Sequence, residues 1–157
     1  LDGVYKMSAV RDPGEPWKYR IKIAEQSTKM TTPGIQQIRR YQQDGLYVAD
    51  MIVDEQMELS SKATMVDPFD ITRQRSFSPR MKYDELLQPI FREGRLVQAM
   101  RPLSDIRAQV QRDLQRFHPG VLRTVNPHEY PVGLERGLFD LRTKLALDVR
   151  NQSRSLD

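Results

Sequence analysis

The first third of the chain alternates apolar and polar residues with the two-residue period of a β-strand. Residues 17–23 carry four apolar side chains at alternate positions and three cations between them: Trp17, Tyr19, Ile21 and Ile23, with Lys18, Arg20 and Lys22. This pattern predicts a strand with one buried face and one cationic face. Residues 3–10 form a second strand-like run, and Asp12-Pro13-Gly14 between the two runs predicts a turn. We therefore expect a β-hairpin here.

Two further hairpins are predicted by acid–glycine dipeptides, because both residues tolerate the positive φ of a tight turn. Asp44-Gly45 separates the strand-like residues 38–41 from residues 46–53. Glu93-Gly94 divides the segment 86–100 in the same way. Pro89 within this segment indicates that its first strand lies at a sheet edge or carries a bulge.

The last third of the chain changes to the spacing of amphipathic helices. After Pro102, Ser104 is a suitable N-cap and Asp105 is favourable in the first turn, and His118-Pro119-Gly120 predicts the helix end. One face of this helix carries Ile106, Val110, Leu114 and Phe117. A second helix is predicted from the spacing of Leu134, Leu138, Leu141, Leu145 and Val149, and residues 151–157 are expected to fray.

These patterns divide the single region 1–157 into four parts. They are a β-rich part at 1–54, an irregular excursion at 55–80, a β-hairpin at 81–100 and a helical part at 103–150. The excursion is inferred because residues 55–79 are polar and follow no regular period. The predicted fold class is therefore α+β, with antiparallel hairpins followed by two amphipathic helices.

The composition narrows the classes of protein that remain. At 157 residues the chain suits one domain with a real core, and its 38% hydrophobic and 29% charged residues are typical of soluble globular proteins. No segment approaches the roughly 18 consecutive apolar residues of a membrane span. The absence of cysteine excludes disulfides and thiolate metal sites and fits a reducing compartment. Because the chain starts at Leu1 without a signal-peptide pattern, we interpret it as the middle of a longer chain.

The net charge of +4 is unevenly distributed, since residues 5–40 contain eight Lys or Arg against three acids. Such a patch suits a nucleic-acid backbone, a phosphorylated ligand or a simple solvated face. Lys6, Lys22 and Lys29 converge if the first two strands pair, and three ammonium groups in one crevice form a phosphate or pyrophosphate site. The alternative interpretation is that they are ordinary solvated lysines.

No other residues in the sequence make a strong catalytic or metal site. His118 precedes Pro-Gly at a predicted helix end, which favours capping over catalysis. His128 and Glu129 are adjacent in an extended segment, so their side chains point to opposite sides and do not readily form an acid/base pair. Asp67 and Asp70 supply too few oxygens for calcium and are better explained as turn caps. We therefore assign no catalytic residue and no metal ligand to the chain.

Four motifs, taken in order, resemble the C-terminal region of nicotinate phosphoribosyltransferase. They are LDGVYKM at 1–7, IKIAEQSTKMTTPG at 21–34, YDELLQPIFREGRLV at 83–97 followed by PLSDIRAQVQRDLQRFHPG at 102–120, and NPHEYPVGL at 126–134 followed by FDLR at 139–142. The NPHEYPVGL motif is the most distinctive of them. Because its two prolines restrict the backbone, we expect an extended strap in which Tyr130 and Val132 are buried.

The resemblance implies an enzyme of NAD salvage that joins nicotinate to phosphoribosyl pyrophosphate and releases pyrophosphate, with Mg²⁺ and coupled ATP hydrolysis. It implies a cytoplasmic homodimer, in which an α/β barrel holds the substrates and this chain flanks the barrel as the C-terminal region. The family's catalytic histidine and phosphate loop lie upstream of Leu1. The chain alone is therefore expected to be inactive and to bind no cofactor.

The resemblance also implies that Lys6, Lys22 and Lys29 are substrate-binding residues at the phosphate end of the site. The expected partners are the enzyme's own barrel and N-terminal segment and a second subunit, with neither nucleic acid nor a membrane. The alternative is a free-standing basic module that binds nucleic acid or a protein. That module lacks a clear stacking platform, because Trp17 and Tyr19 are predicted on the buried strand face.

Overall fold

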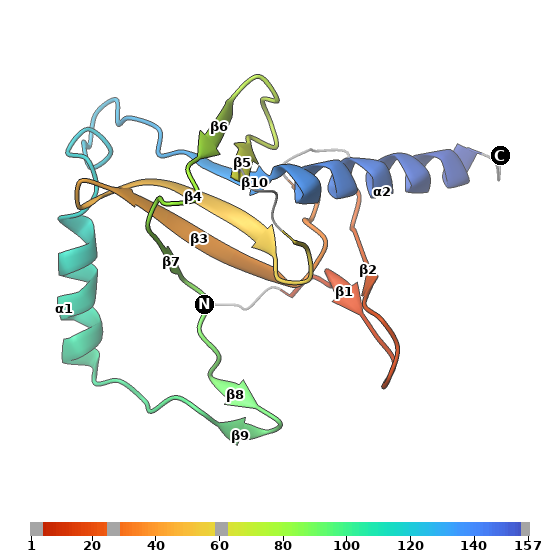
Figure 1. Cartoon of the computed structure of the whole chain (residues 1–157), viewed down its shortest axis with the longest axis horizontal. Coiled ribbons are helices and arrows are strands. Elements are labelled where there is room, and N and C mark those ends of the chain that lie inside the picture. The colour runs from red at the N-terminus through yellow and green to blue at the C-terminus, as the bar shows by residue number, and fades with distance from the viewer. Residues whose placement is uncertain (1–4, 25–28, 59–62, 155–157) are drawn as a thin grey trace. The chain divides into compact units, whose positions relative to one another are not determined.

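The computed structural model describes residues 5–24, 29–58 and 63–154, which contain short strands and two helices (Figure 1). The strands are β1 (Ala9–Val10), β2 (Lys18–Tyr19), β3 (Gln36–Gln43), β4 (Leu46–Asp54), β5 (Ala63–Val66), β6 (Gln74–Phe77), β7 (Tyr83–Glu85), β8 (Phe91–Arg92), β9 (Arg95–Leu96) and β10 (Val132–Glu135). The helices are α1 (Leu103–Leu114) and α2 (Arg136–Arg154). The fold is therefore α+β, as the sequence patterns predicted.

The three predicted hairpins are confirmed. β1 pairs with β2 in antiparallel register, and β8 pairs with β9. At the turn between β3 and β4, Asp44 and Gly45 have φ values of 51° and 83°. At the turn between β8 and β9, Glu93 and Gly94 have φ values of 49° and 75°. Two consecutive positive φ values give the tight turn whose twist matches that of the flanking strands.

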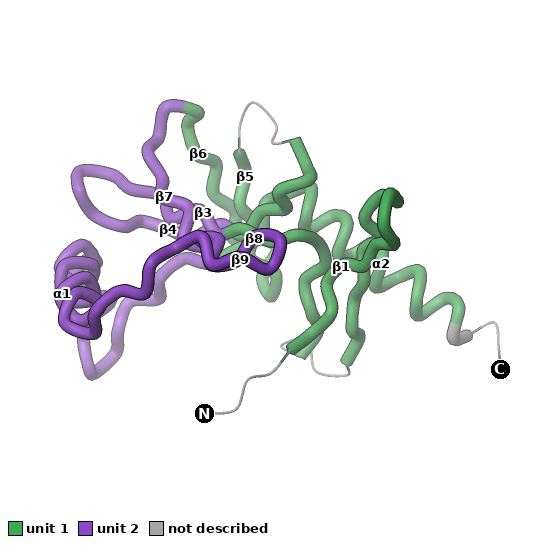
Figure 2. Tube along the Cα trace, turned by 90° about the horizontal axis from the view of Figure 1, so that it is seen from below, with its two compact units in different colours: residues 1–37, 52–79, 133–157 green, residues 38–51, 80–132 purple. Residues whose placement is uncertain are grey.

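The largest sheet has the strand order β6-β5-β10-β4-β3-β7. Its strands come from distant parts of the chain, since β10 from the last third lies between β5 and β4. The chain divides into two compact units (Figure 2). Unit 1 contains residues 1–37, 52–79 and 133–157, and unit 2 contains residues 38–51 and 80–132.

The core of unit 1 is built from the end of β4, from β5, β6 and β10, and from α2. β5 pairs antiparallel with both β6 and β10, and α2 packs against β5. The buried apolar side chains are Val53, Met65, Val66, Phe77, Leu134, Leu138 and Ala146. Glycine is required at position 133, because a Cβ there would lie 2.6 Å from the Met65 side chain and from the Val66 carbonyl oxygen.

The predicted irregular excursion at 55–80 is wrong in part, because this segment contains β5 and β6. Each strand has only four residues, which is too short for a two-residue period to stand out in the sequence. The turn between them confirms the predicted caps. Oδ1 of Asp67 accepts a hydrogen bond from the Phe69 amide at 2.8 Å, and Oδ1 of Asp70 accepts one from the Thr72 amide at 3.0 Å.

The limits of α1 differ from those predicted. Pro102, rather than Ser104, occupies the N-cap position, and no side chain caps the first amides. The helix ends at Leu114 rather than at His118. The Gly120 amide donates to Nδ1 of His118 at 3.0 Å. The histidine ring therefore stabilises the turn that follows the helix, and the predicted capping of the helix end is wrong.

The start of α2 also differs, because Leu134 belongs to β10 and not to the helix. It is 1% exposed, so its burial was predicted but its element was not. Oε2 of Glu135 accepts a hydrogen bond from the Gly137 amide at 2.6 Å, and a carboxylate in this position stabilises a helix N-terminus. Residues 151–157 were predicted to fray, but α2 continues to Arg154, so this prediction is wrong for residues 151–154. The last three residues lie outside the described part.

Unit 2 is organised around an ion pair between β3 and β4. Arg40 donates from Nε and Nη2 to the two carboxylate oxygens of Asp50, at 2.9 and 2.7 Å. Tyr130, in the segment before β10, donates its hydroxyl to Oδ1 of Asp50 at 2.9 Å. The Arg40 guanidinium lies over the rings of Tyr47 and Phe117, 4.9 and 5.3 Å from their centroids. The pair is thus both hydrogen-bonded and covered by aromatic rings, which a buried ion pair requires.

The segment that follows α1 is attached to β4 beside this ion pair. The Tyr47 amide donates to the Arg116 carbonyl at 2.7 Å, and Nη1 of Arg116 donates to the Tyr47 hydroxyl at 2.8 Å. The Phe117 ring packs edge-on against the rings of Tyr47 and Tyr130, with centroid separations of 5.2 and 5.0 Å. Tyr130 therefore packs into the unit, as predicted.

The remainder of unit 2 buries almost no apolar surface. Between Arg80 and Val132, a stretch that is described throughout, no hydrophobic side chain is buried, and α1 has no buried residue. Val132 itself was expected to be buried and is 49% exposed. The exposed large hydrophobic residues of this stretch are Tyr83, Leu87, Ile90, Phe91, Leu96, Val97, Met100, Leu103, Ile106, Val110, Leu114, Leu122, Val125 and Val132. These side chains are left exposed within the described part of the chain.

Replacing Asp50 by alanine is expected to destabilise the chain by about 3–5 kcal/mol, because it leaves the Arg40 charge without its carboxylate and the Tyr130 hydroxyl without its acceptor. Tyr130→Phe removes one hydrogen bond only and should cost about 1 kcal/mol. The free energy of unfolding in urea measures both changes. The matched control is Asp84→Ala, whose half-exposed carboxylate pairs with Arg116 at 3.8 Å. Equal losses for Asp50→Ala and Asp84→Ala would contradict a special role for the ion pair.

Candidate functional site

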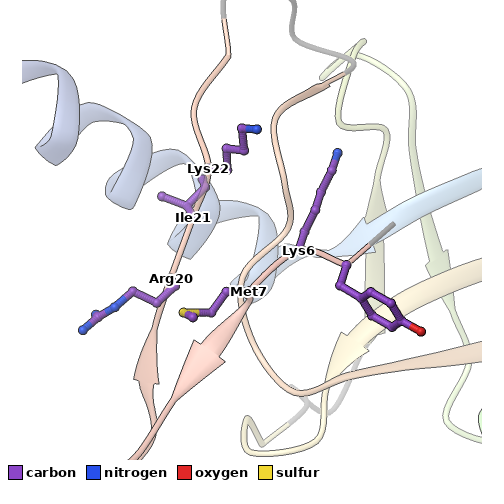
Figure 3. A pocket seen from close by; sticks show the side chains of 6 residues that line it. Lys6, Met7, Arg20, Ile21 and Lys22 are labelled. Carbon is purple, nitrogen blue, oxygen red and sulfur yellow. The ribbon is translucent and has the colours of Figure 1, made fainter. Parts of the chain in front are cut away.

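Two of the three lysines predicted to bind phosphate lie in one pocket of unit 1. The pocket is open, has a volume of about 390 Å³ and is lined by Tyr5, Lys6, Met7, Arg20, Ile21 and Lys22. Figure 3 shows the side chains of Lys6 and Lys22 extending to the same side, whereas the guanidinium of Arg20 extends away from them. The sequence therefore predicted the meeting of Lys6 and Lys22, and it did not single out Tyr5, Met7 or Arg20.

The antiparallel pairing of β1 with β2 brings the two walls of the pocket together. Beyond the last pair of these strands, the Arg20 amide donates to the Ser8 carbonyl at 2.9 Å, which continues the pairing towards the pocket. The predicted alternation along residues 17–23 is confirmed, since the four apolar side chains are partly covered and the three cationic ones are exposed. Lys22 consequently lies on the exposed cationic face of its segment.

Residues 30–34 support both walls from behind. The Gly34 amide donates to the Ser8 carbonyl at 3.0 Å, which holds the first wall. Thr31 holds the second wall at Lys22: its amide donates to the Lys22 carbonyl at 3.1 Å, and its Oγ1 accepts from the Lys22 amide at 2.7 Å. Gly34 has a φ of 101°, and a Cβ there would lie 2.6 Å from Oδ2 of Asp54. Glycine is therefore required for the chain to approach this carboxylate.

Lys29 is exposed and is not among the residues that line the pocket. Residues 25–28, which precede it, lie outside the described part of the chain. Among the ion pairs of the described residues, none involves Lys6 or Lys22. The structure thus places Lys6 and Lys22 together, with no ion-paired carboxylate among the described residues, and leaves Lys29 outside their pocket.

The lining of the pocket permits binding of an anion and offers no apparatus for catalysis. It contains cations and apolar side chains, and it contains neither a carboxylate nor a histidine. Two ammonium groups on one side can each hold phosphate oxygens as point charges. Within the described residues, no group of three His, Asp or Glu side chains could hold a metal ion. This lining can hold an anion by electrostatic attraction.

Two aromatic residues next to the pocket are already engaged by other side chains. The guanidinium of Arg11 lies 4.4 Å from the ring centroid of Trp17. Burial, together with the neighbouring Asp54 carboxylate, raises the pKa of Tyr19 to about 12. Oδ2 of Asp54 is itself buried and has no hydrogen-bond partner among the described residues. Ionised Tyr19 would place a second negative charge beside this carboxylate.

The two histidines, His118 and His128, lie together in unit 2, and they belong to no group of side chains that could hold a metal ion among the described residues. Their rings stack, with centroids 5.8 Å apart and an interplanar angle of 14°. The His128 amide donates to the Gly120 carbonyl at 2.8 Å, and a Cβ at position 120 would collide with the His128 ring. His118 and His128 therefore contribute to the packing of this loop.

A model of the family described as the nicotinate phosphoribosyltransferase C-terminal domain matches residues 35–142. The chain belongs to this family. It is also similar to the crystal structure of human nicotinic acid phosphoribosyltransferase, with a TM-score of 0.64 and 25% sequence identity. The similarity covers 74% of this chain and 24% of the human enzyme's chain. No curated protein matches the chain significantly.

The region shared with the nicotinate phosphoribosyltransferase family contains all six strands of the large sheet, α1 and the start of α2. It confirms the resemblance that the motifs indicated. It begins at residue 35, so the pocket residues 5–7 and 20–22 lie outside it, and their interpretation depends on geometry and charge. In the described part of the chain, no helix is long and apolar enough to cross a membrane.

The raised pKa of Tyr19 predicts a loss of stability at alkaline pH. Between pH 10 and about 12 the folded chain keeps the Tyr19 proton that the unfolded chain has lost, so the free energy of unfolding decreases as the pH rises. Tyr19→Phe removes this contribution, and the difference in unfolding free energy between the wild type and the variant should shrink from pH 9 to pH 11. A difference that stays constant over this range would contradict the assigned environment of Tyr19.

Proposed function

We propose that this chain is the C-terminal region of a nicotinate phosphoribosyltransferase of NAD salvage. The complete enzyme would convert nicotinate, phosphoribosyl pyrophosphate and ATP into nicotinate mononucleotide, pyrophosphate, ADP and phosphate, and would act with Mg²⁺ as a cytoplasmic homodimer. The family match over residues 35–142 is the observation that carries this proposal. The chain corresponds to about a quarter of the human enzyme's length and has no catalytic set of its own, so alone it should not turn over.

The main proposed role of the chain is to support the catalytic barrel and the dimer. The stretch from Arg80 to Val132 supports this proposal, because all of its large hydrophobic side chains stay at least partly exposed when the chain is alone. Ordering a segment costs about 1–2 kcal/mol per residue in backbone entropy, which burial of its apolar side chains has to offset. The remainder of the enzyme is the covering surface that we propose.

A second proposed role is to lend positive charge to the phosphate end of the substrate site through Lys6 and Lys22. Displacement at the anomeric carbon of ribose releases pyrophosphate, whose negative charge must be held in position while a cationic centre develops. The shared pocket of Lys6 and Lys22 and the absence of ion pairs to them among described residues support this role. Lys29 remains a weaker proposal, since it lies outside the pocket.

The docking role predicts a substitution that harms only the complete enzyme. Val110 of α1 is 49% exposed in this chain, so Val110→Lys should leave the stability of the isolated chain unchanged. In the full-length protein the new charge would be buried against the barrel and should cost about 2 kcal/mol or more. Thermal unfolding of both forms measures the difference. Gln111→Lys, at the next and also exposed position, is the control, and equal tolerance of the two variants in the full-length protein would contradict docking through Val110.

The phosphate role predicts altered kinetics in the full-length protein. Lys6→Ala should raise the KM for phosphoribosyl pyrophosphate or lower kcat by about tenfold, because a charge-assisted hydrogen bond to phosphate contributes about 1.5–3 kcal/mol. Lys18→Ala is the matched control, since Lys18 lies in β2 but does not line the pocket. Unchanged kinetics in Lys6→Ala would remove this lysine from the site. If the wild-type full-length protein shows no nicotinate-dependent activity, the proposed enzyme is refuted.

A further inference from the structure

A buried arginine lies behind the segment that supports the pocket. Arg142 of α2 is 5% exposed, and its Nε donates to the carbonyl oxygen of Thr31 at 3.3 Å. These two residues are 111 positions apart in the chain, and both are buried. Figure 1 shows α2 and the N-terminal hairpin as elements from opposite ends of the sequence. The hydrogen bond therefore attaches the C-terminal helix to the backbone next to the pocket.

Thr31 is in turn hydrogen-bonded to Lys22. Its amide and its hydroxyl both bond the backbone of Lys22, so three hydrogen bonds connect Arg142, Thr31 and Lys22 in sequence. Lys22 belongs to a segment with no further strand beyond β2, which ends at Tyr19. Thr31 therefore fixes the position of the Lys22 backbone, from which the side chain and its ammonium group extend.

The environment of Arg142 is costly if its function is packing alone. Burial lowers the pKa of its guanidinium, and among the described residues no carboxylate forms an ion pair with it. Among the described residues a carbonyl oxygen is the hydrogen-bond partner of this charge, and burying a charge without a carboxylate is unfavourable compared with burying an apolar side chain of similar size. A planar, multidentate donor is nevertheless well suited to fixing a carbonyl in one position.

We propose that Arg142 is a positioning residue for the phosphate pocket, acting through Thr31 to hold Lys22 in place. This inference rests on the proposed phosphate role of Lys22. Arg142 need not touch the ligand, because its effect is transmitted by the hydrogen bonds of Thr31. Substitutions at Arg142 and at the Thr31 hydroxyl should consequently weaken the same binding event.

The test uses the full-length protein with inorganic pyrophosphate as the probe, and isothermal titration calorimetry gives the dissociation constant. Arg142→Met and Thr31→Val should each weaken binding by about five- to tenfold, since small displacements of a positioned group have large effects. Arg142→Lys keeps a cationic donor and Thr31→Ser keeps the hydroxyl, so both should stay close to the wild type. Thermal unfolding identifies the variants that fold.

The outcomes separate this inference from the proposed function. Weaker binding in Thr31→Val with rescue by Thr31→Ser supports positioning, also where Arg142→Met fails to fold. If Lys22→Ala weakens binding while Thr31→Val and, where it folds, Arg142→Met bind as the wild type does, the positioning role is overturned and the phosphate role stands. If Lys22→Ala binds pyrophosphate as tightly as the wild type, Lys22 has no phosphate role and the positioning role fails with it.

Discussion

The bidentate ion pair between Arg40 and Asp50 is the interaction on which the order of unit 2 depends. Most of this unit lacks a hydrophobic core, because nothing apolar between Arg80 and Val132 is buried. The ion pair instead connects β3, β4 and Tyr130 through directional bonds, and the Arg40 guanidinium lies over the Tyr47 ring. A satisfied buried network of this kind specifies one arrangement more than it adds stability. The distinctive NPHEYPVGL motif is thereby held to the sheet through its tyrosine.

Local patterns in the sequence predicted the local elements of this fold. The turns at Asp44-Gly45 and Glu93-Gly94 were found because a two-residue hairpin needs positive φ, and few residue types adopt it readily. Leu134 shows where such reasoning ends. It continues the helical spacing of Leu138 and Leu141, yet it pairs with Val66 in β5, and the partner strand that decides its conformation is distant in sequence. A side chain that is buried in either element leaves no local signal of which element it joins.

The sequence also predicted the local part of the candidate site and missed the part that depends on distant residues. Alternation along residues 17–23 placed Lys22 on a cationic face, and the turn at Pro13-Gly14 brought Lys6 beside it. Lys29 lies beyond the reach of that argument, because the alternation of apolar and cationic residues ends at Ile23. Thr31 and Arg142 carried no signal, since their contribution depends on a backbone carbonyl and on hydrogen bonds across 111 positions. Backbone acceptors are the same at every residue, so sequence alone cannot identify the one that matters.

The surroundings of the cations bear on the nucleic-acid alternative. In unit 2, three arginines form ion pairs among the described residues: Arg39 with Glu85, Arg40 with Asp50 and Arg116 with Asp84. A basic module that tracks a nucleic-acid backbone needs unpaired cations along a surface, interleaved with aromatic rings on which bases stack. Near the cations of unit 1, Trp17 is covered by Arg11, and Tyr19 lies beside Asp54. Lys6 and Lys22 form no ion pair among the described residues and converge on one pocket, which suits a compact phosphorylated ligand better than a strand of nucleic acid.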